Sequence, residues 1–138
     1  MTTFESRVGK IQSSKEKVFN FLSDFNNFKQ FIPGDKVDNW KSDIESCSFN
    51  VSGIGEVGLK IVEKDPFDLI KITGNGMASV EFYLWIQLKE VVEEDTRVKL
   101  TMKAELNPMM KMVASKPLNN FLELMVKYME DFSFEDVD

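Results

Sequence analysis

The strongest hydrophobic pattern of the chain lies near its carboxyl end. Apolar residues there recur at spacings of three and four, which predicts a long helix over residues 109–132 with one apolar stripe. Asn107 and Pro108 form a typical helix start, because Asn caps free backbone N–H groups and Pro at the first position donates none. Pro117 is expected to kink or split the helix, because it removes one backbone hydrogen bond and clashes with the preceding turn. The stripe consists of Leu118, Phe121, Leu122, Met125, Tyr128, Met129 and Phe132.

Between residues 35 and 106, apolar and polar residues alternate with a period of two. This period, with one polar face, is typical of an antiparallel sheet that packs on one side. Turn-forming residues such as Asp65-Pro66 and Gly74-Asn75-Gly76 separate the alternating runs. The predicted strands are residues 36–41, 44–51, 55–63, 68–74, 78–91 and 96–106.

The amino-terminal third predicts one strand and two helices. Residues 3–11 alternate loosely and predict a first strand. Ser13 or Ser14 is expected to cap the first helix, and Ser13 with Glu16 matches the capping-box spacing. A second short helix over residues 28–32 is expected to stop at Pro33-Gly34.

The order of elements is therefore strand, two helices, six strands and a long helix. This order predicts an α+β fold in which a curved antiparallel sheet of about seven strands wraps around the carboxyl-terminal helix, since each needs the other to cover its apolar face. We expect a single domain over residues 1–138, with residues 1–2 and 133–138 loosely ordered.

Composition narrows the classes of partner. The 138 residues include 17 basic and 23 acidic side chains, a net charge of −6, so no basic surface for nucleic acid or for an anionic membrane is expected. No apolar run approaches the roughly 20 residues that span a bilayer, and no secretory signal is recognised, so we expect no stable membrane insertion. The single cysteine, Cys47, suits a reducing compartment and predicts a cytoplasmic protein.

The sequence resembles the START-related (SRPBCC) superfamily, whose members have the helix-grip fold. Residues 14–24 with Pro33 are similar to the strand-to-helix segment of this superfamily, and Asn107-Pro108 before a Met-rich helix is similar to its last element. The resemblance implies a cavity between sheet and helix for an apolar or amphipathic small molecule. It also implies a range of activities, because the superfamily includes lipid carriers, quinone-binding proteins, aromatase/cyclases and sensors of hydrophobic ligands.

The candidate cavity residues are large apolar side chains on the predicted sheet and helix. Methionine suits an adaptable apolar wall, although a Met stripe at helical spacing is also typical of ordinary core packing. Phe49 shares a face with Cys47, and the sequence leaves open whether this face or the alternating serine face is interior. The candidates are Trp40, at the rim, and Phe49, Phe82, Leu84, Met102, Met109, Met112, Phe121 and Met125.

Residues for catalysis are scarce. The chain has no histidine, so no Ser-His or Cys-His nucleophile pair and no His-containing metal site can form, and we expect no metal and no cofactor. The Gly53-x-Gly55-x-x-Gly58 pattern is followed by a predicted strand instead of the helix that a dinucleotide site requires. Cys47 has no adjacent cation to lower its pKa and is expected to be inert.

Three functions follow from these observations. The first is a carrier or sensor of a hydrophobic small molecule such as a lipid, a quinone or a polyketide-like compound, acting as a monomer or weak homodimer. The second is a cyclase or aromatase, which an inward-facing Asp, Glu or Arg would favour. The third is a protein-interaction module with a filled cavity, which a cavity below roughly 300 Å³ would favour.

Overall fold

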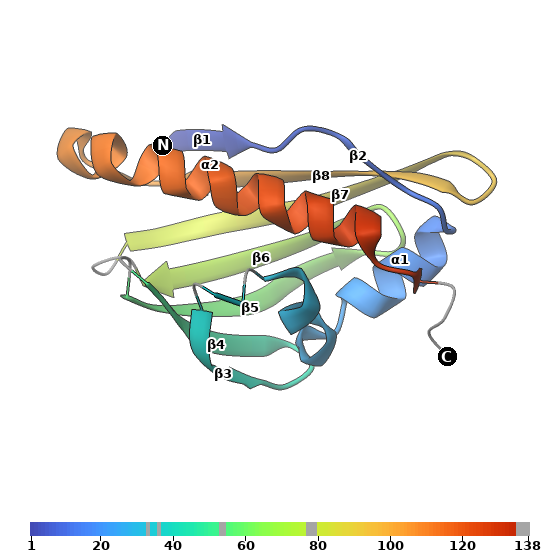
Figure 1. Cartoon of the computed structure of the whole chain (residues 1–138), viewed down its shortest axis with the longest axis horizontal. Coiled ribbons are helices and arrows are strands. Elements are labelled where there is room, and N and C mark those ends of the chain that lie inside the picture. The colour runs from blue at the N-terminus through green and yellow to red at the C-terminus, as the bar shows by residue number, and fades with distance from the viewer. Residues whose placement is uncertain (33, 36, 53–54, 77–79, 135–138) are drawn as a thin grey trace.

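A curved antiparallel sheet wraps around one long helix (Figure 1). The computed structural model describes residues 1–32, 34–35, 37–52, 55–76 and 80–134. Within these residues the sheet has eight strands in the order β1-β8-β7-β6-β5-β4-β3, with β2 also paired to β8. The α+β helix-grip prediction is confirmed. The strands are β1 Thr2–Glu5, β2 Gly9–Ile11, β3 Val37–Ser42, β4 Ser46–Val51, β5 Gly55–Asp65, β6 Leu69–Gly76, β7 Val80–Val92 and β8 Asp95–Ala104.

The first predicted strand, residues 3–11, is divided into β1 and β2. Between them Ser6 bonds twice to one residue of β8: its N–H donates to the Leu100 carbonyl, and its Oγ accepts from the Leu100 N–H, both at 2.9 Å. The next N–H, of Arg7, donates to the Glu123 carboxylate on the long helix at 2.8 Å instead of to a sheet carbonyl. The segment therefore leaves the sheet because it contacts the helix.

Two short helices follow β2. The helix α1 (Lys15–Leu22) is capped by Ser14, whose Oγ accepts from the Lys17 N–H, so the cap is Ser14 and not Ser13. The second is a 3₁₀ helix, η1 (Phe25–Phe31), which starts three residues earlier than predicted because Asp24 caps it through the Asn26 N–H at 2.9 Å. Pro33, where it was expected to stop, lies outside the described residues, as does Gly53 of the glycine pattern.

The long helix α2 (Pro108–Asp131) begins at the predicted cap. The Asn107 side chain accepts from the Met110 N–H at 2.8 Å. The helix is continuous through Pro117, so the predicted split is wrong. One missing backbone bond does not end the helix there, because Leu118 and Leu122 of the following turns are buried in the core.

The core lies between the concave face of the sheet and α2. Inward side chains of the central strands, such as Ile72, Ile86 and Leu100, are completely buried. An aromatic cluster joins η1 to the end of α2, and its members are Phe21, Phe25, Phe28, Phe31, Phe132 and Phe134. Phe134 belongs to the segment expected to be loosely ordered, yet it is only 3% exposed; residues 135–138 lie outside the described residues.

None of the helices in the described ranges is long and apolar enough to cross a membrane.

Candidate functional site

An apolar cavity of about 60 Å³ lies between α2 and the sheet. The helix packs closely against β1, β2, β8 and η1, and the cavity lies where it spans β4, β5 and β7. Phe121, which is only partly buried, lies at the edge of this space. The lining consists of Phe28, Ile32, Phe49, Val51, Val57, Leu59, Phe82, Leu84, Met102, Leu118, Phe121, Leu122 and Met125.

The period-two pattern of the strands explains why this lining is entirely apolar. On β4 the buried set is Cys47, Phe49 and Val51, so the apolar face is interior and the serine face points outward. The same alternation turns alternate apolar residues of β5 and β7 inward. The cavity therefore offers a ligand dispersion contacts and apolar burial but no hydrogen-bonding side chain.

A glycine shapes one wall of the cavity. Gly74 on β6 lies directly opposite Phe82 on β7, and a Cβ at Gly74 would lie 2.3 Å from Phe82 Cζ. The same Cβ would lie 2.9 Å from Leu59 Cδ2. The Phe82 ring therefore lies against the bare backbone of Gly74, and a larger residue there would force the ring from this position.

A β-bulge places Trp40 beside the cavity wall. Asp38 pairs with Asn50 and Lys41 pairs with Ser48, so two residues of β3, including Trp40, lie opposite Phe49. The Trp40 and Phe49 rings are stacked, with centroids 5.2 Å apart and planes at 17°. Trp40 supports the wall residue from the side and does not itself line the cavity.

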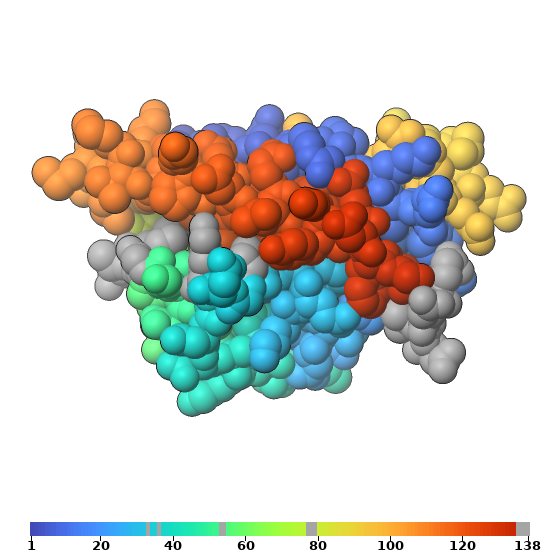
Figure 2. All heavy atoms as spheres, viewed as in Figure 1, coloured from blue at the N-terminus to red at the C-terminus, as the bar shows by residue number. Residues whose placement is uncertain are grey.

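Six of the nine predicted site residues lie around this one cavity: Phe49, Phe82, Leu84, Met102, Phe121 and Met125. Met109 and Met112 do not, because they are 76% and 83% exposed. Figure 2 shows why: the first turns of α2 project beyond the body of the molecule, so their apolar side chains have no sheet beneath them.

Sequence analysis missed seven of the lining residues. Val57 and Leu59 could have been found, because they belong to a clear alternating run that places them on the inner face of β5. Leu118 and Leu122 belong to the recognised helical stripe. For η1 the sequence carries no equivalent signal, because a short 3₁₀ helix has no long periodicity. The missed residues are Phe28, Ile32, Val51, Val57, Leu59, Leu118 and Leu122.

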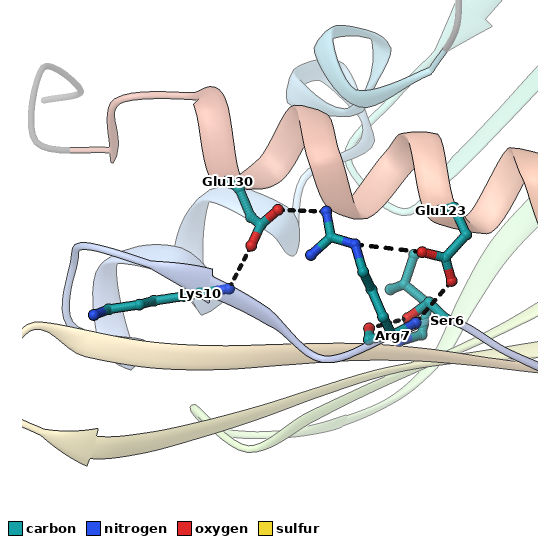
Figure 3. A network of polar contacts seen from close by, with 6 residues as sticks. Ser6, Arg7, Lys10, Glu123 and Glu130 are labelled. Carbon is teal, nitrogen blue, oxygen red and sulfur yellow. Dashed lines mark hydrogen bonds and ion pairs between the residues drawn. The ribbon is translucent and has the colours of Figure 1, made fainter.

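A polar network holds the second half of α2 on the segment between β1 and β2 (Figure 3). Arg7 donates through Nη2 to Glu130 at 2.5 Å, and its Nε lies 3.4 Å from Glu123 Oε2. The Lys10 N–H donates to the other Glu130 oxygen at 2.9 Å. The network therefore fixes the part of α2 that follows the cavity, whereas the projecting turns lie at the other end of the helix.

The same contacts explain the protonation of the network. The hydrogen bond from Arg7 is the main cause that lowers the pKa of Glu130, and the bond from the Lys10 N–H acts in the same direction. The hydrogen bond to Glu130 likewise raises the pKa of Arg7. These groups are ionised at neutral pH and serve as a tie between strand segment and helix.

Reactive and metal-binding groups are sparse near the cavity. Burial, and secondly the charge of Asp43, raises the pKa of Cys47 to about 12, so this residue is a neutral thiol at neutral pH. The side chains that line the cavity carry no ionisable group. Among the described residues, no cluster of three or more Asp, Glu or Cys side chains is arranged to hold a metal ion.

Larger hollows exist at the surface, but they differ in kind. One of about 610 Å³ lies between the start of β1 and the start of α2, with Glu105 and Lys111 in its wall. Another of about 540 Å³ lies over β3 and β4 beside Lys41 and Glu56. Both are more open than the apolar cavity and have polar walls, so a hydrophobic molecule would remain largely in contact with water there.

Comparisons with known proteins identify the family. Residues 9–133 match the family described as the CoxG subunit of carbon monoxide dehydrogenase, and this match covers most of the chain. Comparison with curated protein sequences gives no match.

Similar solved structures agree on the fold. A conserved protein from Geobacillus kaustophilus is 16% identical with a TM-score of 0.65, covering 94% of this chain and 96% of its own. Norcoclaurine synthase from Thalictrum flavum, in complex with dopamine and hydroxybenzaldehyde, is 13% identical with a TM-score of 0.67, covering 96% and 88%. The Aha1 dimer from Colwellia psychrerythraea is 20% identical with a TM-score of 0.58, covering 95% of both chains. At these identities the likeness concerns the fold alone. This chain therefore belongs to the CoxG family of carbon monoxide dehydrogenase subunits, within the START-related (SRPBCC) superfamily.

Proposed function

We propose that this protein binds a hydrophobic small molecule in the cavity between α2 and the sheet and acts as its carrier or sensor. The observation that carries the proposal is the lining, in which all thirteen side chains are apolar. Such a wall suits a hydrocarbon portion, such as the acyl chain of a lipid or the isoprenoid chain of a quinone. Any polar group of the ligand would remain outside, near the partly exposed Phe121.

Binding requires the cavity to enlarge. Its volume of about 60 Å³ is well below the roughly 300–1,000 Å³ typical of small-molecule pockets. Met102 and Met125 support enlargement, because unbranched thioether side chains repack at little cost. Leu118 and Phe121 also support it, since they directly follow Pro117, where α2 lacks one backbone hydrogen bond.

The proposal is tested with a pyrene-labelled dodecanoic acid titrated into the protein and then displaced by unlabelled fatty acids, isoprenoid quinones and aromatic polyketides. Val57→Phe fills the cavity and is expected to weaken binding of the labelled acid at least tenfold. Val57→Leu adds one methylene and should give an intermediate loss. Circular dichroism checks that both variants are folded, because overpacking costs about 1–3 kcal/mol.

The matched control is Val62→Phe on the same strand, because Val62 is 50% exposed and points away from the cavity. It is expected to leave binding within twofold of the native protein. No binding of any probe, or equal weakening by Val57→Phe and Val62→Phe, would contradict the proposal.

The second candidate is a protein-interaction module whose cavity is filled by its own side chains. The small volume of the cavity is the observation that favours it. The exposed Met109, Met112 and Val113 on the projecting turns of α2 offer an apolar surface for such a role. A protein that remains free of small molecules in every titration would support this candidate over the carrier.

The cyclase alternative gains no support from the cavity. Catalysis of a cyclisation would need an acid, a base or a polar donor near the substrate. Each side chain in the described lining is apolar, so we propose no catalytic residue. The single, buried Cys47 remains in keeping with a reducing compartment, and we propose the cytoplasm as the site of action.

A further inference from the structure

The outer face of the sheet carries a group of lysines around two aromatic rings. We name this group the aromatic–lysine patch. It lies on the side of β5–β8 opposite the cavity, because its residues alternate with buried ones along each strand. Its members are Lys60, Lys71, Tyr83, Trp85, Lys99 and Lys103.

Strand register brings these residues together. One cross-strand row runs from Lys60 through Thr73 and Tyr83 to Lys103. The next row contains Lys71 and Trp85 as direct partners. Neighbouring strands are about 4.8 Å apart, so the row from β5 to β8 is about 14 Å long, which is the length of about four extended residues.

The aromatic rings hold two of the ammonium groups in place. Lys71 Nζ lies 5.0 Å from the centre of the Tyr83 ring and 5.6 Å from that of Trp85. Lys103 Nζ lies 5.7 Å from the Trp85 ring. These cation–π contacts restrict the lysine side chains before any partner binds, so less conformational entropy is lost on binding.

The charges of the patch are not neutralised by the chain itself. Lys99 forms an ion pair with Glu5 at 3.4 Å. Within the described residues, Lys60, Lys71 and Lys103 form no ion pair with a carboxylate. Four lysines thus gather on one area of a chain whose net charge is −6.

We propose that the aromatic–lysine patch docks a short acidic segment of a partner protein. Carboxylates of an extended segment would bind the ammonium groups, and its backbone and apolar atoms would cover Tyr83 and Trp85. The complementarity of charge favours this occupant, since ion pairs across an interface select partners and orient them.

The surroundings of the patch set the size of this segment. Acidic residues border it on several sides, at Glu5, Glu63, Glu81 and Glu105. A long polyanion such as a nucleic acid would be repelled by this border and by the net charge of the chain. A segment of about four to six residues would reach the lysines without contacting the border.

The test uses a fluorescein-labelled ten-residue oligoglutamate peptide and fluorescence anisotropy at about 20 mM and 150 mM salt. The native chain is expected to bind the peptide, and more weakly at the higher salt concentration. Lys71→Glu with Lys103→Glu is expected to weaken binding at least tenfold. Trp85→Leu, which keeps every charge but removes one ring, should weaken it about threefold.

The control for charge is Lys116→Glu with Lys127→Glu, because both lysines are exposed on α2, away from the patch. This variant has the same net charge as the patch variant and is expected to change binding less than threefold. Equal weakening by the two double variants, or no binding by the native chain up to millimolar peptide, would overturn the proposal. Tighter binding of a labelled ten-nucleotide oligothymidine than of the peptide would also overturn it.

Discussion

At the residue scale, the shape of the cavity depends on which positions have no side chain. Gly74 is the clearest case, because the Phe82 ring occupies the space where its Cβ would be. Gly9 has a similar role under the helix: a Cβ there would lie 2.5 Å from Val126 Cγ1 of α2. Both glycines permit close packing, and neither requires an unusual backbone angle.

Gly74→Ala is expected to lower the free energy of unfolding by about 1–3 kcal/mol, because the added methyl displaces the Phe82 ring from the sheet. Urea unfolding followed by circular dichroism measures the change. Adding Phe82→Leu should recover part of the loss, since the smaller side chain leaves room for the methyl group.

Gly34→Ala is the matched control for Gly74→Ala, because a Cβ at Gly34 meets no atom within 4 Å. It should change the stability by less than about 0.5 kcal/mol. Similar effects of the two alanine variants would contradict the assigned role of Gly74.

At the element scale, α2 has two differently held halves. The end of the helix is fixed by the Arg7–Glu130 network and by the buried Phe132 and Phe134 cluster. Its first turns project beyond the sheet (Figure 2). The cavity lies below the turns between these two parts, so the elements that hold α2 also control the cover of the cavity.

Glu130→Gln is expected to lower the free energy of unfolding by about 1 kcal/mol at pH 7, a modest value because the Arg7 side chain is 47% exposed. Arg7 lowers the folded-state pKa of Glu130 below its ordinary value of 4.5, so its contribution is complete above that value. It is lost as the pH falls through the folded-state pKa. The difference between the native chain and the variant should therefore shrink between about pH 5 and pH 3 in urea unfolding.

Glu93→Gln is the control for this pH dependence, because Glu93 is an exposed carboxylate at the end of β7. It should leave stability unchanged at both pH values. A difference between the native chain and Glu130→Gln that is constant with pH, or that grows on acidification, would contradict the role assigned to Arg7.

The elements themselves could largely be predicted from the sequence, because period two and the helical stripe are local signals. The break at Ser6 and Arg7 could not, since it depends on Leu100 and on Glu123, which are distant in the sequence. Phe82 and Leu84 could be placed at the cavity because their strand alternates clearly. Met109 and Met112 could not be assigned, because the part of α2 that covers the sheet depends on how far the helix extends beyond it.

At the scale of the whole molecule, the fold separates two surfaces of different chemistry. The concave face of the sheet and α2 enclose apolar atoms only, whereas the convex face carries the aromatic–lysine patch. A ligand in the cavity and a protein on the patch would therefore bind on opposite sides of one sheet. The two proposals are independent, because the variants that test one leave the residues of the other unchanged.

The central claim is that the cavity holds a hydrophobic small molecule. Native mass spectrometry of the freshly purified protein, with an organic extract of the same sample analysed for small molecules, tests this claim most directly. The account predicts a stoichiometric adduct that disappears on denaturation, is reduced in Val57→Phe and is retained in Val62→Phe. A mass equal to that of the polypeptide alone, with no thermal shift on addition of fatty acids, quinones or aromatic polyketides, would contradict it.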